Sequence, residues 1–339
     1  MALKQWANET MQGVQNMLIP SFTPDLAELD EDGIRWDVQQ SIRHGFFGMS
    51  CTTQVGLTFA EAKRFVEIAV AEANGRIQVS PVCTFDSIAA NIAFIQHAAQ
   101  AGCDTILLGY PPNFYPETPE EIYEVTQQMC QAAAQTPMVL YLSFKWNYGR
   151  FHPSGFPLDI LERLTDIPNV VGLLVGIIEP GFVHEAFRRF GDKVLVQAPW
   201  ERWAPLLTTQ LGMQWFGPGA YELFQTPEKP SLINYYNHLL NGQIDEAMQI
   251  FWQLTPVRLI FEKQFMPTQM IGTYHWPQQK FYQWLTGGNG GFTRQPVMKM
   301  YQHEMDEVKN ILPAIGIEPR DNYNEFYVGR MNYEKGFRP

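Results

Sequence analysis

Three hydroxyl groups and one amine stand where they could act on a small molecule. Thr52 and Thr53 close a mostly apolar run, and Tyr141 lies within the apolar run 138–144, which Lys145 follows directly. Hydroxyls can hold a carboxylate or pass a proton. A lysine in apolar surroundings can act as nucleophile or base, because burial lowers its pKa. The plainer interpretations stay open: turn or capping threonines, a packed core tyrosine and a solvated loop lysine.

Aromatic side chains follow these candidates along the chain. Phe144, Trp146 and Trp200 come directly after apolar runs. Large aromatic groups beside a few polar ones favour an apolar or aromatic ligand. Glu201 either lines the same pocket or begins a helix whose dipole it complements. The sequence favours neither interpretation of Glu201.

The elements that must position these residues alternate in type. The runs 138–144 and 170–175 lack polar alternation, which is typical of strands buried on both faces. Between them, 156–164 has apolar residues at helical spacing, so the three segments predict a parallel crossover unit. Ligands gather beyond the carboxyl ends of such strands. The predicted site therefore lies at 144–149 and 176–181.

Eight apolar runs alternate with helical patterns between residues 15 and 228. The predicted strands are 17–22, 46–53, 77–84, 105–110, 138–144, 170–175, 193–197 and 213–216. This order predicts an α/β fold, a (β/α)8 TIM barrel with a C-terminal helical extension. A doubly wound open sheet is the alternative, which the absence of a Gly-rich dinucleotide fingerprint disfavours. The predicted division is a barrel at 15–228, a helical region at 229–315 and an extended tail at 316–339.

Composition excludes several classes of protein. The chain has 339 residues, 45% of them hydrophobic, and a formal net charge of −11. An acidic chain is unsuited to non-specific binding of nucleic acid or anionic membrane. We expect a cytoplasmic protein, since it has neither an apolar run of 18 residues nor a signal-peptide core. Its four cysteines lack CxxC spacing, and no His, Asp or Glu cluster has ligand spacing, so we expect neither metal nor cofactor.

Five motifs in this order resemble the dihydrodipicolinate synthase and N-acetylneuraminate lyase superfamily of class I aldolases, over roughly residues 15–265. The motifs are Cys51-Thr52-Thr53, Leu57-Thr58-Phe59-Ala60-Glu61-Ala62-Lys63-Arg64, Gly102-Cys103-Asp104-Thr105-Ile106-Leu107-Leu108, Val139-Leu140-Tyr141 and Ile167-Pro168-Asn169-Val170-Val171-Gly172. The spacing around Tyr110-Pro111-Pro112 and the long C-terminal part are closer to the hydratase-aldolase branch. Enzymes of that branch act on aryl-substituted unsaturated 2-oxo acids. The resemblance implies a small-molecule substrate and a homodimer or homotetramer, with Tyr141 as the catalytic tyrosine and Tyr110 near the substrate.

The chain departs from the family pattern where the chemistry is done. The family's imine-forming lysine falls at Leu174, or at Ile178 if the register is shifted, and neither side chain can form an imine. The Gly-Glu after the two threonines is replaced by Gln54-Val55-Gly56. The tyrosine that a neighbouring subunit inserts in well-known members matches roughly Asn113. The resemblance therefore implies that this chain keeps the hydroxyl groups of Thr52, Thr53 and Tyr141 and lacks the amine of the family's lysine.

Three hypotheses follow. The first is a lyase-like enzyme of a specialised biosynthetic pathway, which acts on a small carbonyl or 2-oxo-acid-like substrate. It would use Tyr141 and the threonines for dehydration, cyclisation or retro-aldol cleavage without an imine. General acid-base catalysis supplies about 10²–10⁴-fold, so the substrate must be intrinsically labile. The second is an aldolase whose imine has moved to Lys145. The third is a non-catalytic descendant that binds a small acid or serves as a partner subunit.

Overall fold

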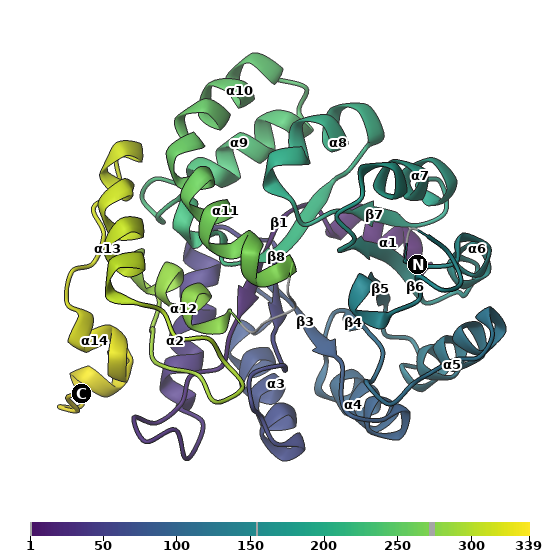
Figure 1. The fold of residues 1–339 in the computed structure, drawn as a ribbon, viewed down its shortest axis with the longest axis horizontal. Helices are drawn as coiled ribbons and strands as arrows, with labels where there is room; N and C mark the ends of the chain where they lie inside the picture. Colours follow the sequence, from purple (N-terminus) through teal and green to yellow (C-terminus); the bar gives the residue numbers. More distant parts are fainter. Residues whose placement is uncertain (1, 154, 271–274) are drawn as a thin grey trace. The chain divides into compact units, whose positions relative to one another are not determined.

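The computed structural model describes residues 2–153, 155–270 and 275–339. Eight parallel strands alternate with helices and form a (β/α)8 barrel, as the sequence predicts (Figure 1). Along the sheet they follow the order β7-β6-β5-β4-β3-β2-β1-β8. The strands are β1 Gly13–Leu18, β2 Gly48–Cys51, β3 Gln78–Cys83, β4 Ile106–Leu108, β5 Met138–Leu142, β6 Val170–Val175, β7 Leu195–Gln197 and β8 Trp215–Gly219.

Helices follow the strands and continue beyond the last one. Helix α1 Leu3–Thr10 precedes β1. The helices that follow β1 to β7 are α2 Glu31–Arg43, α3 Phe59–Ala73, α4 Ile88–Ala101, α5 Pro119–Ala132, α6 Leu158–Thr165, α7 Pro180–Phe190 and α8 Ala204–Leu211, with short 3-10 helices η1 Phe144–Trp146, η2 Glu201–Trp203 and η3 Tyr221–Phe224. The extension holds α9 Ser231–Leu240, α10 Ile244–Gln253, α11 Thr255–Met270, α12 Trp276–Leu285, α13 Gln302–Ile311, η4 Leu312–Ile315, α14 Tyr323–Val328 and α15 Arg330–Glu334. Thr58 and Glu61 form a capping box at the start of α3.

The chain divides into two compact units. The first comprises Met1–Gly13 and Gln78–Gly217, and the second comprises Val14–Ile77 and Pro218–Pro339. In the first unit β3 to β7 pair in parallel, and α4 to α7 flank them in succession (Figure 1). In the second unit β1 and β2 pair in parallel beside α2, α3 and the C-terminal helices. The division at 228 and 315 stays a prediction.

The last segment of the chain is helical, whereas the sequence analysis predicts an extended tail. Residues 316–339 contain α14 and α15. The Asn332 side chain donates hydrogen bonds to the Phe22 carbonyl and to Asp30, and Lys335 pairs with Asp32. These contacts hold the segment against the loop that follows β1. The prediction of an extended tail is wrong on this point. Contacts with Phe22, Asp30 and Asp32, which are distant in the sequence, hold the tail in place, and local sequence does not reveal them.

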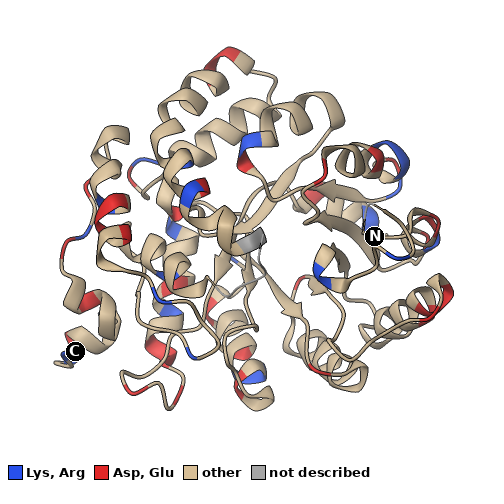
Figure 2. Cartoon of the chain, in the orientation of Figure 1, with Lys and Arg blue, Asp and Glu red and all other residues tan. Residues whose placement is uncertain are grey.

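Charged groups lie mainly on helices and loops. In the described residues, Lys and Arg are scattered among Asp and Glu rather than gathered into one patch (Figure 2). None of the helices within 2–153, 155–270 and 275–339 combines the length and apolar character that crossing a bilayer requires.

The second unit contains a buried ion pair between α2 and α12. Lys280 Nζ lies 3.0 Å from Asp37 Oδ2, and the two side chains are 0% and 5% exposed. The same ammonium donates to Ser21 Oγ at 2.8 Å and to the Ile19 carbonyl. Asp37 Oδ1 accepts from the Asn289 backbone N–H at 2.6 Å. Both charges are therefore fully hydrogen-bonded, which is what makes their burial tolerable.

Removing one partner of this pair is expected to be costly. Lys280→Met leaves Asp37 as an uncompensated buried charge, so the free energy of unfolding should fall by about 3–5 kcal/mol in urea titrations. The double variant Lys280→Met/Asp37→Leu should recover much of this loss, because both charges are then gone. Equal stability of the single variant and the wild type would contradict the assignment.

A buried carboxyl group lies close to this pair in the second unit. Glu222 in η3 is 3% exposed, and its Oε1 accepts hydrogen bonds from the side-chain amides of Asn16 and of Gln283. Burial raises the pKa of Glu222 to about 8, and the Asp37 carboxylate adds to the shift. Glu222 is therefore mostly protonated at neutral pH.

This pKa predicts a pH dependence of stability. The folded state holds the Glu222 proton more tightly than the unfolded chain, whose glutamate pKa is near 4.5. Between pH 4.5 and about 8, the free energy of unfolding should fall as pH rises, by up to about 1.4 kcal/mol per pH unit. Urea titrations at pH 6, 7 and 8 should show a flatter dependence in Glu222→Gln than in the wild type. Parallel slopes for the two proteins would refute the shift.

Candidate active site

A row of three residues lies at the carboxyl ends of β5, β6 and β7. Tyr141 is the register partner of Leu174, and Leu174 is the register partner of Gln197. Side chains of register partners project from the same face of a sheet, and successive residues of a strand alternate between faces. The three side chains therefore share one face.

That face is the interior of the barrel. Leu108 of β4 pairs with Leu140, so Tyr110, two residues further on, shares their face. The Tyr110 hydroxyl donates to Thr126 of α5 at 2.6 Å, which marks this face as the one the helices cover. Tyr141, the neighbour of Leu140, projects from the opposite face, toward the interior.

Tyr141 is held from several sides. The Trp146 indole N–H donates to the Tyr141 carbonyl at 2.7 Å, and the two rings meet edge to face, with centroids 5.6 Å apart. A Cβ at Gly176 would lie 2.7 Å from the ring of Tyr141, so the glycine makes room for the phenol. Burial raises the pKa of Tyr141, and a hydrogen bond with Ser143 opposes this shift. The phenol is therefore protonated at neutral pH and suited to donate a proton or a hydrogen bond.

Trp146 turns back over the strand ends. A Cβ at Gly109 would lie 2.6 Å from the indole of Trp146 and 2.6 Å from Thr84. The indole therefore fills the space beside the ends of β3 and β4 and forms an apolar wall next to Tyr141.

Lys145 and Phe144 lie in η1, directly after β5. The Lys145 backbone N–H donates to Ser143 Oγ at 3.2 Å. The Lys145 side chain is exposed, yet desolvation by the surrounding protein lowers its pKa. Phe144 is 40% exposed. Both residues therefore lie at the strand-end loop where the sequence predicts them.

Tyr110 and Asn113 are not part of the row that contains Tyr141, and their predicted role in substrate binding stays a prediction. Tyr110 is 4% exposed and packs against Phe114 and Tyr148 on the helix side of the sheet. Its hydroxyl is committed to Thr126 and is not presented to the interior. Asn113 is exposed in the turn that follows β4. Neither residue joins the row with Tyr141.

The segment after β7 is folded inward. Glu201 in η2 is 6% exposed, and the rings of Trp200 and Trp203 meet edge to face with centroids 6.2 Å apart. The Trp200 indole N–H is buried and has no hydrogen-bond partner among the described residues. Whether Trp200 and Glu201 bind a substrate stays a prediction.

Thr52 and Thr53 belong to the second unit, and both are buried. The Thr52 N–H donates to the Leu18 carbonyl at 2.9 Å, which continues the ladder between β1 and β2. The indole N–H of Trp276 donates to the Gln54 carbonyl at 2.6 Å. The loop that bears the threonines is thus held in place by the C-terminal extension.

Arg294 also holds this loop. It donates to the Gly56 carbonyl and forms a two-pronged ion pair with Glu61, at 2.7 and 2.8 Å. Hydrogen bonds from Arg294 lower the pKa of Glu61 to about 2. Gly56 stands in the segment that replaces the family's Gly-Glu, so the structure shows what anchors this altered loop.

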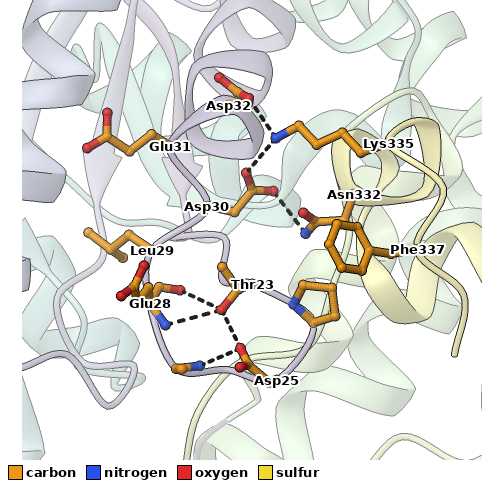
Figure 3. Close-up of a pocket in the computed structure, with 12 residues that line it drawn as sticks. Thr23, Asp25, Glu28, Leu29, Asp30, Glu31, Asp32, Asn332, Lys335 and Phe337 are labelled. Carbon is orange, nitrogen blue, oxygen red and sulfur yellow. Dashed lines mark hydrogen bonds and ion pairs between the residues drawn. The ribbon is translucent and has the colours of Figure 1, made fainter.

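One pocket of about 590 Å³ lies in the second unit, and neither Thr52 nor Thr53 lines it (Figure 3). Its lining includes the carboxylates of Asp25, Glu28, Asp30, Glu31 and Asp32, with Asn332, Lys335 and Phe337 opposite. The Lys335 ammonium pairs with Asp32 at 2.7 Å and lies 4.0 Å from Asp30. Such a lining is unfavourable for an anionic substrate. Within the described residues, no group of three or more His, Cys, Asp or Glu side chains is placed to hold a metal ion.

The fold is that of a (β/α)8 barrel protein, with its candidate site at the carboxyl ends of the strands. The sequence model of the dihydrodipicolinate synthetase family matches residues 10–196. The chain therefore belongs to this family.

Individual proteins agree with the assignment. A 4-hydroxy-tetrahydrodipicolinate synthase of Methanopyrus kandleri is 24% identical over 258 residues, which are 73% of this chain and 80% of that protein. A second, from Phenylobacterium zucineum, is 28% identical over 240 residues, 68% of this chain and 76% of that protein. Family membership and these relatives support a lyase-type enzyme.

Solved structures share the fold. N-acetylneuraminate lyase from Fusobacterium nucleatum superposes with a TM-score of 0.75 at 16% identity, covering 90% of this chain and 99% of that one. Dihydrodipicolinate synthase from Oceanobacillus iheyensis superposes with a TM-score of 0.72 at 18% identity, covering 92% and 98%. At these identities the likeness concerns the fold alone.

Sequence reasoning missed two polar residues of the first unit. Ser143 is 1% exposed and bonds both Tyr141 and the Lys145 backbone. Gln197 is fully buried on the row with Tyr141. The sequence does hold a signal for Gln197, because an amide side chain ends an otherwise apolar strand. In a (β/α)8 barrel, ligands bind at the carboxyl ends of the strands.

The close packing around Trp146 gives a prediction about the site. Gly109→Ala would force its new methyl group against the indole and Thr84, so we expect a loss of about 1–3 kcal/mol in unfolding free energy and altered tryptophan fluorescence. Gly149→Ala is the matched control, since nothing lies within 4 Å of its Cβ position. A Gly109→Ala protein with wild-type stability and spectrum would show that the indole lies elsewhere.

Proposed function

We propose that this chain is a lyase that acts on a small carbonyl or 2-oxo-acid-like substrate by hydroxyl acid-base chemistry, without an amine on β6. The observation that carries the proposal is the register of β5 and β6. The residue beside Tyr141 on the interior face is Leu174, and β6 contains no lysine. An aliphatic side chain at this place cannot form an imine with a 2-oxo acid.

Tyr141 supplies the acid in this proposal. Its protonated phenol donates to a carbonyl or hydroxyl oxygen of the substrate, and the Ser143 hydroxyl keeps the phenol oriented. Leu174 and Trp146 provide the apolar surface, where electrostatic interactions are stronger than in water. Thr52 and Thr53 are assigned to the substrate carboxylate by their place in the family motif alone.

The rate enhancement that acid-base groups can supply limits the reactions that such a site can catalyse. A positioned general acid or base contributes about 10²–10⁴-fold, so the substrate must dehydrate, cyclise or undergo retro-aldol cleavage readily. The family branch with the nearest spacing suggests aryl-substituted unsaturated 2-oxo acids. A cytoplasmic homodimer or homotetramer remains part of the proposal.

Lys145 offers a second route. Its amine is exposed at the end of β5, and its lowered pKa makes the neutral, nucleophilic form more accessible. An imine there would retain the family's chemistry on a neighbouring strand. A non-catalytic protein that only binds an acid is the third possibility.

Borohydride trapping separates the three. The protein is incubated with pyruvate or with a 4-aryl-2-oxobut-3-enoate, reduced with borohydride and weighed by intact-mass spectrometry. We expect no covalent adduct, and in a parallel sample without borohydride we expect loss of the conjugated chromophore of the aryl acid as it is hydrated or cleaved. An adduct mapped to Lys145 would establish the moved imine instead, and binding without turnover would favour the non-catalytic protein.

Tyr141→Phe tests the acid directly. Turnover should fall at least about 100-fold, while the affinity for the aryl acid changes only a few-fold. Tyr148→Phe is the matched control. Tyr148 is 1% exposed on the helix side, and its hydroxyl has no partner among the described residues, so its loss should leave turnover intact. Unchanged turnover in Tyr141→Phe would remove the phenol from the mechanism.

A further inference from the structure

Gln197 is the other polar member of the interior row. It is the last residue of β7, its side chain is 0% exposed, and it is the register partner of Leu174. Adjacent strands lie about 4.8 Å apart, so the Cα atoms of Gln197 and Tyr141 are roughly 10 Å apart across β6. The Leu174 side chain lies between them on the same face. A small acid bound over Leu174 would meet Tyr141 at one end and Gln197 at the other.

The orientation of the Gln197 amide is determined by β8. Gln197 Nε2 donates to the Gly217 carbonyl at 2.6 Å. A carbonyl accepts only, so the nitrogen must face Gly217 and Oε1 must face away from it. The buried Oε1 has no hydrogen-bond partner among the described residues. A buried acceptor without a partner costs free energy, which an apolar side chain here would avoid.

Two buried glutamines of the second unit do not lie on this row. Gln225 in the second unit uses both amide atoms, donating to the His44 carbonyl and accepting from the Ile233 N–H. Gln283 leaves its oxygen unpaired, but its nitrogen donates to the Glu222 carboxyl in the core of the second unit. Gln197 alone of these three shares a face with Tyr141.

We propose that Gln197 Oε1 is the acceptor that selects hydroxyl-bearing acids in this site. The inference rests on the proposed function and narrows its substrate class to carbonyl or 2-oxo-acid-like compounds that also carry a hydroxyl group, the group that dehydration and retro-aldol cleavage require. Tyr141 donates to a carbonyl or carboxylate oxygen of the ligand, and the ligand hydroxyl donates to Gln197. A ketone oxygen in place of the hydroxyl group would face Gln197 Oε1, and two acceptors repel each other. The ketone analogue should therefore bind more weakly.

Three probes isolate the hydroxyl. Mandelate carries it, phenylglyoxylate has a carbonyl in its place, and the methyl ether of mandelate has an oxygen that cannot donate. By calorimetric titration, the wild type should bind mandelate about tenfold more tightly than either analogue, the size of one hydrogen bond to a buried acceptor. Equal affinity for mandelate and its methyl ether would overturn the inference without need of any variant.

The variant Gln197→Met tests whether Gln197 causes the preference for mandelate over its analogues. Methionine has a similar length and no amide, so mandelate should bind about tenfold more weakly, while phenylglyoxylate changes less than about twofold. Gln225→Met is the matched control: it loses a buried amide in the second unit and should keep the wild-type preference. A preference that survives in Gln197→Met would also refute the role.

The outcomes separate this inference from the function on which it rests. If the wild type binds all three acids alike, the Gln197 role fails, and the borohydride and Tyr141→Phe results stand by themselves. If the wild type binds none of the three, the acid-binding site itself is contradicted, and the Gln197 role is lost with it.

Discussion

The register between β5, β6 and β7 is the constraint on which the candidate site depends. In a parallel sheet the pairing of backbone groups decides which side chains lie next to each other and on which face. Here it sets Tyr141, Leu174 and Gln197 in one interior row. A slip of one residue would turn Tyr141 toward the helices and bring Leu142 into the barrel. The chemistry available to the chain therefore follows from backbone hydrogen bonds as much as from the side chains themselves.

The space around Tyr141 depends on two residues that have no side chain. Gly176 leaves room for the phenol, and Gly109 leaves room for the Trp146 indole. The indole in turn donates to the Tyr141 backbone, so its position and that of the tyrosine are coupled. An aromatic wall of this kind excludes water and strengthens the few polar interactions within it. It also suits the apolar or aromatic substrate that the proposal requires.

The C-terminal extension is part of the second unit's core. Lys280 of α12 is buried against Asp37 of α2, and the Asn289 backbone completes the carboxylate's hydrogen bonds. Arg294 and Trp276 reach the loop that follows β2. Because these contacts engage the loop that carries Thr52 and Thr53, the extension both stabilises its unit and determines the shape of a predicted binding loop. Arg294 and Trp276 thus anchor the segment that follows the threonines.

The sequence by itself determined the barrel, since uninterrupted apolar runs alternating with helical patterns leave few other arrangements. It also predicted a role for Tyr141 and the absence of an imine-forming lysine, because both predictions follow from residue identity at a strand end. It could not place Tyr110, whose hydroxyl turns to Thr126, nor identify Gln197, whose unpaired oxygen depends on a carbonyl from another strand. Only the tertiary structure decides such matters. Which partner a polar atom meets depends on register and on elements distant in the sequence, and neither is encoded in local spacing.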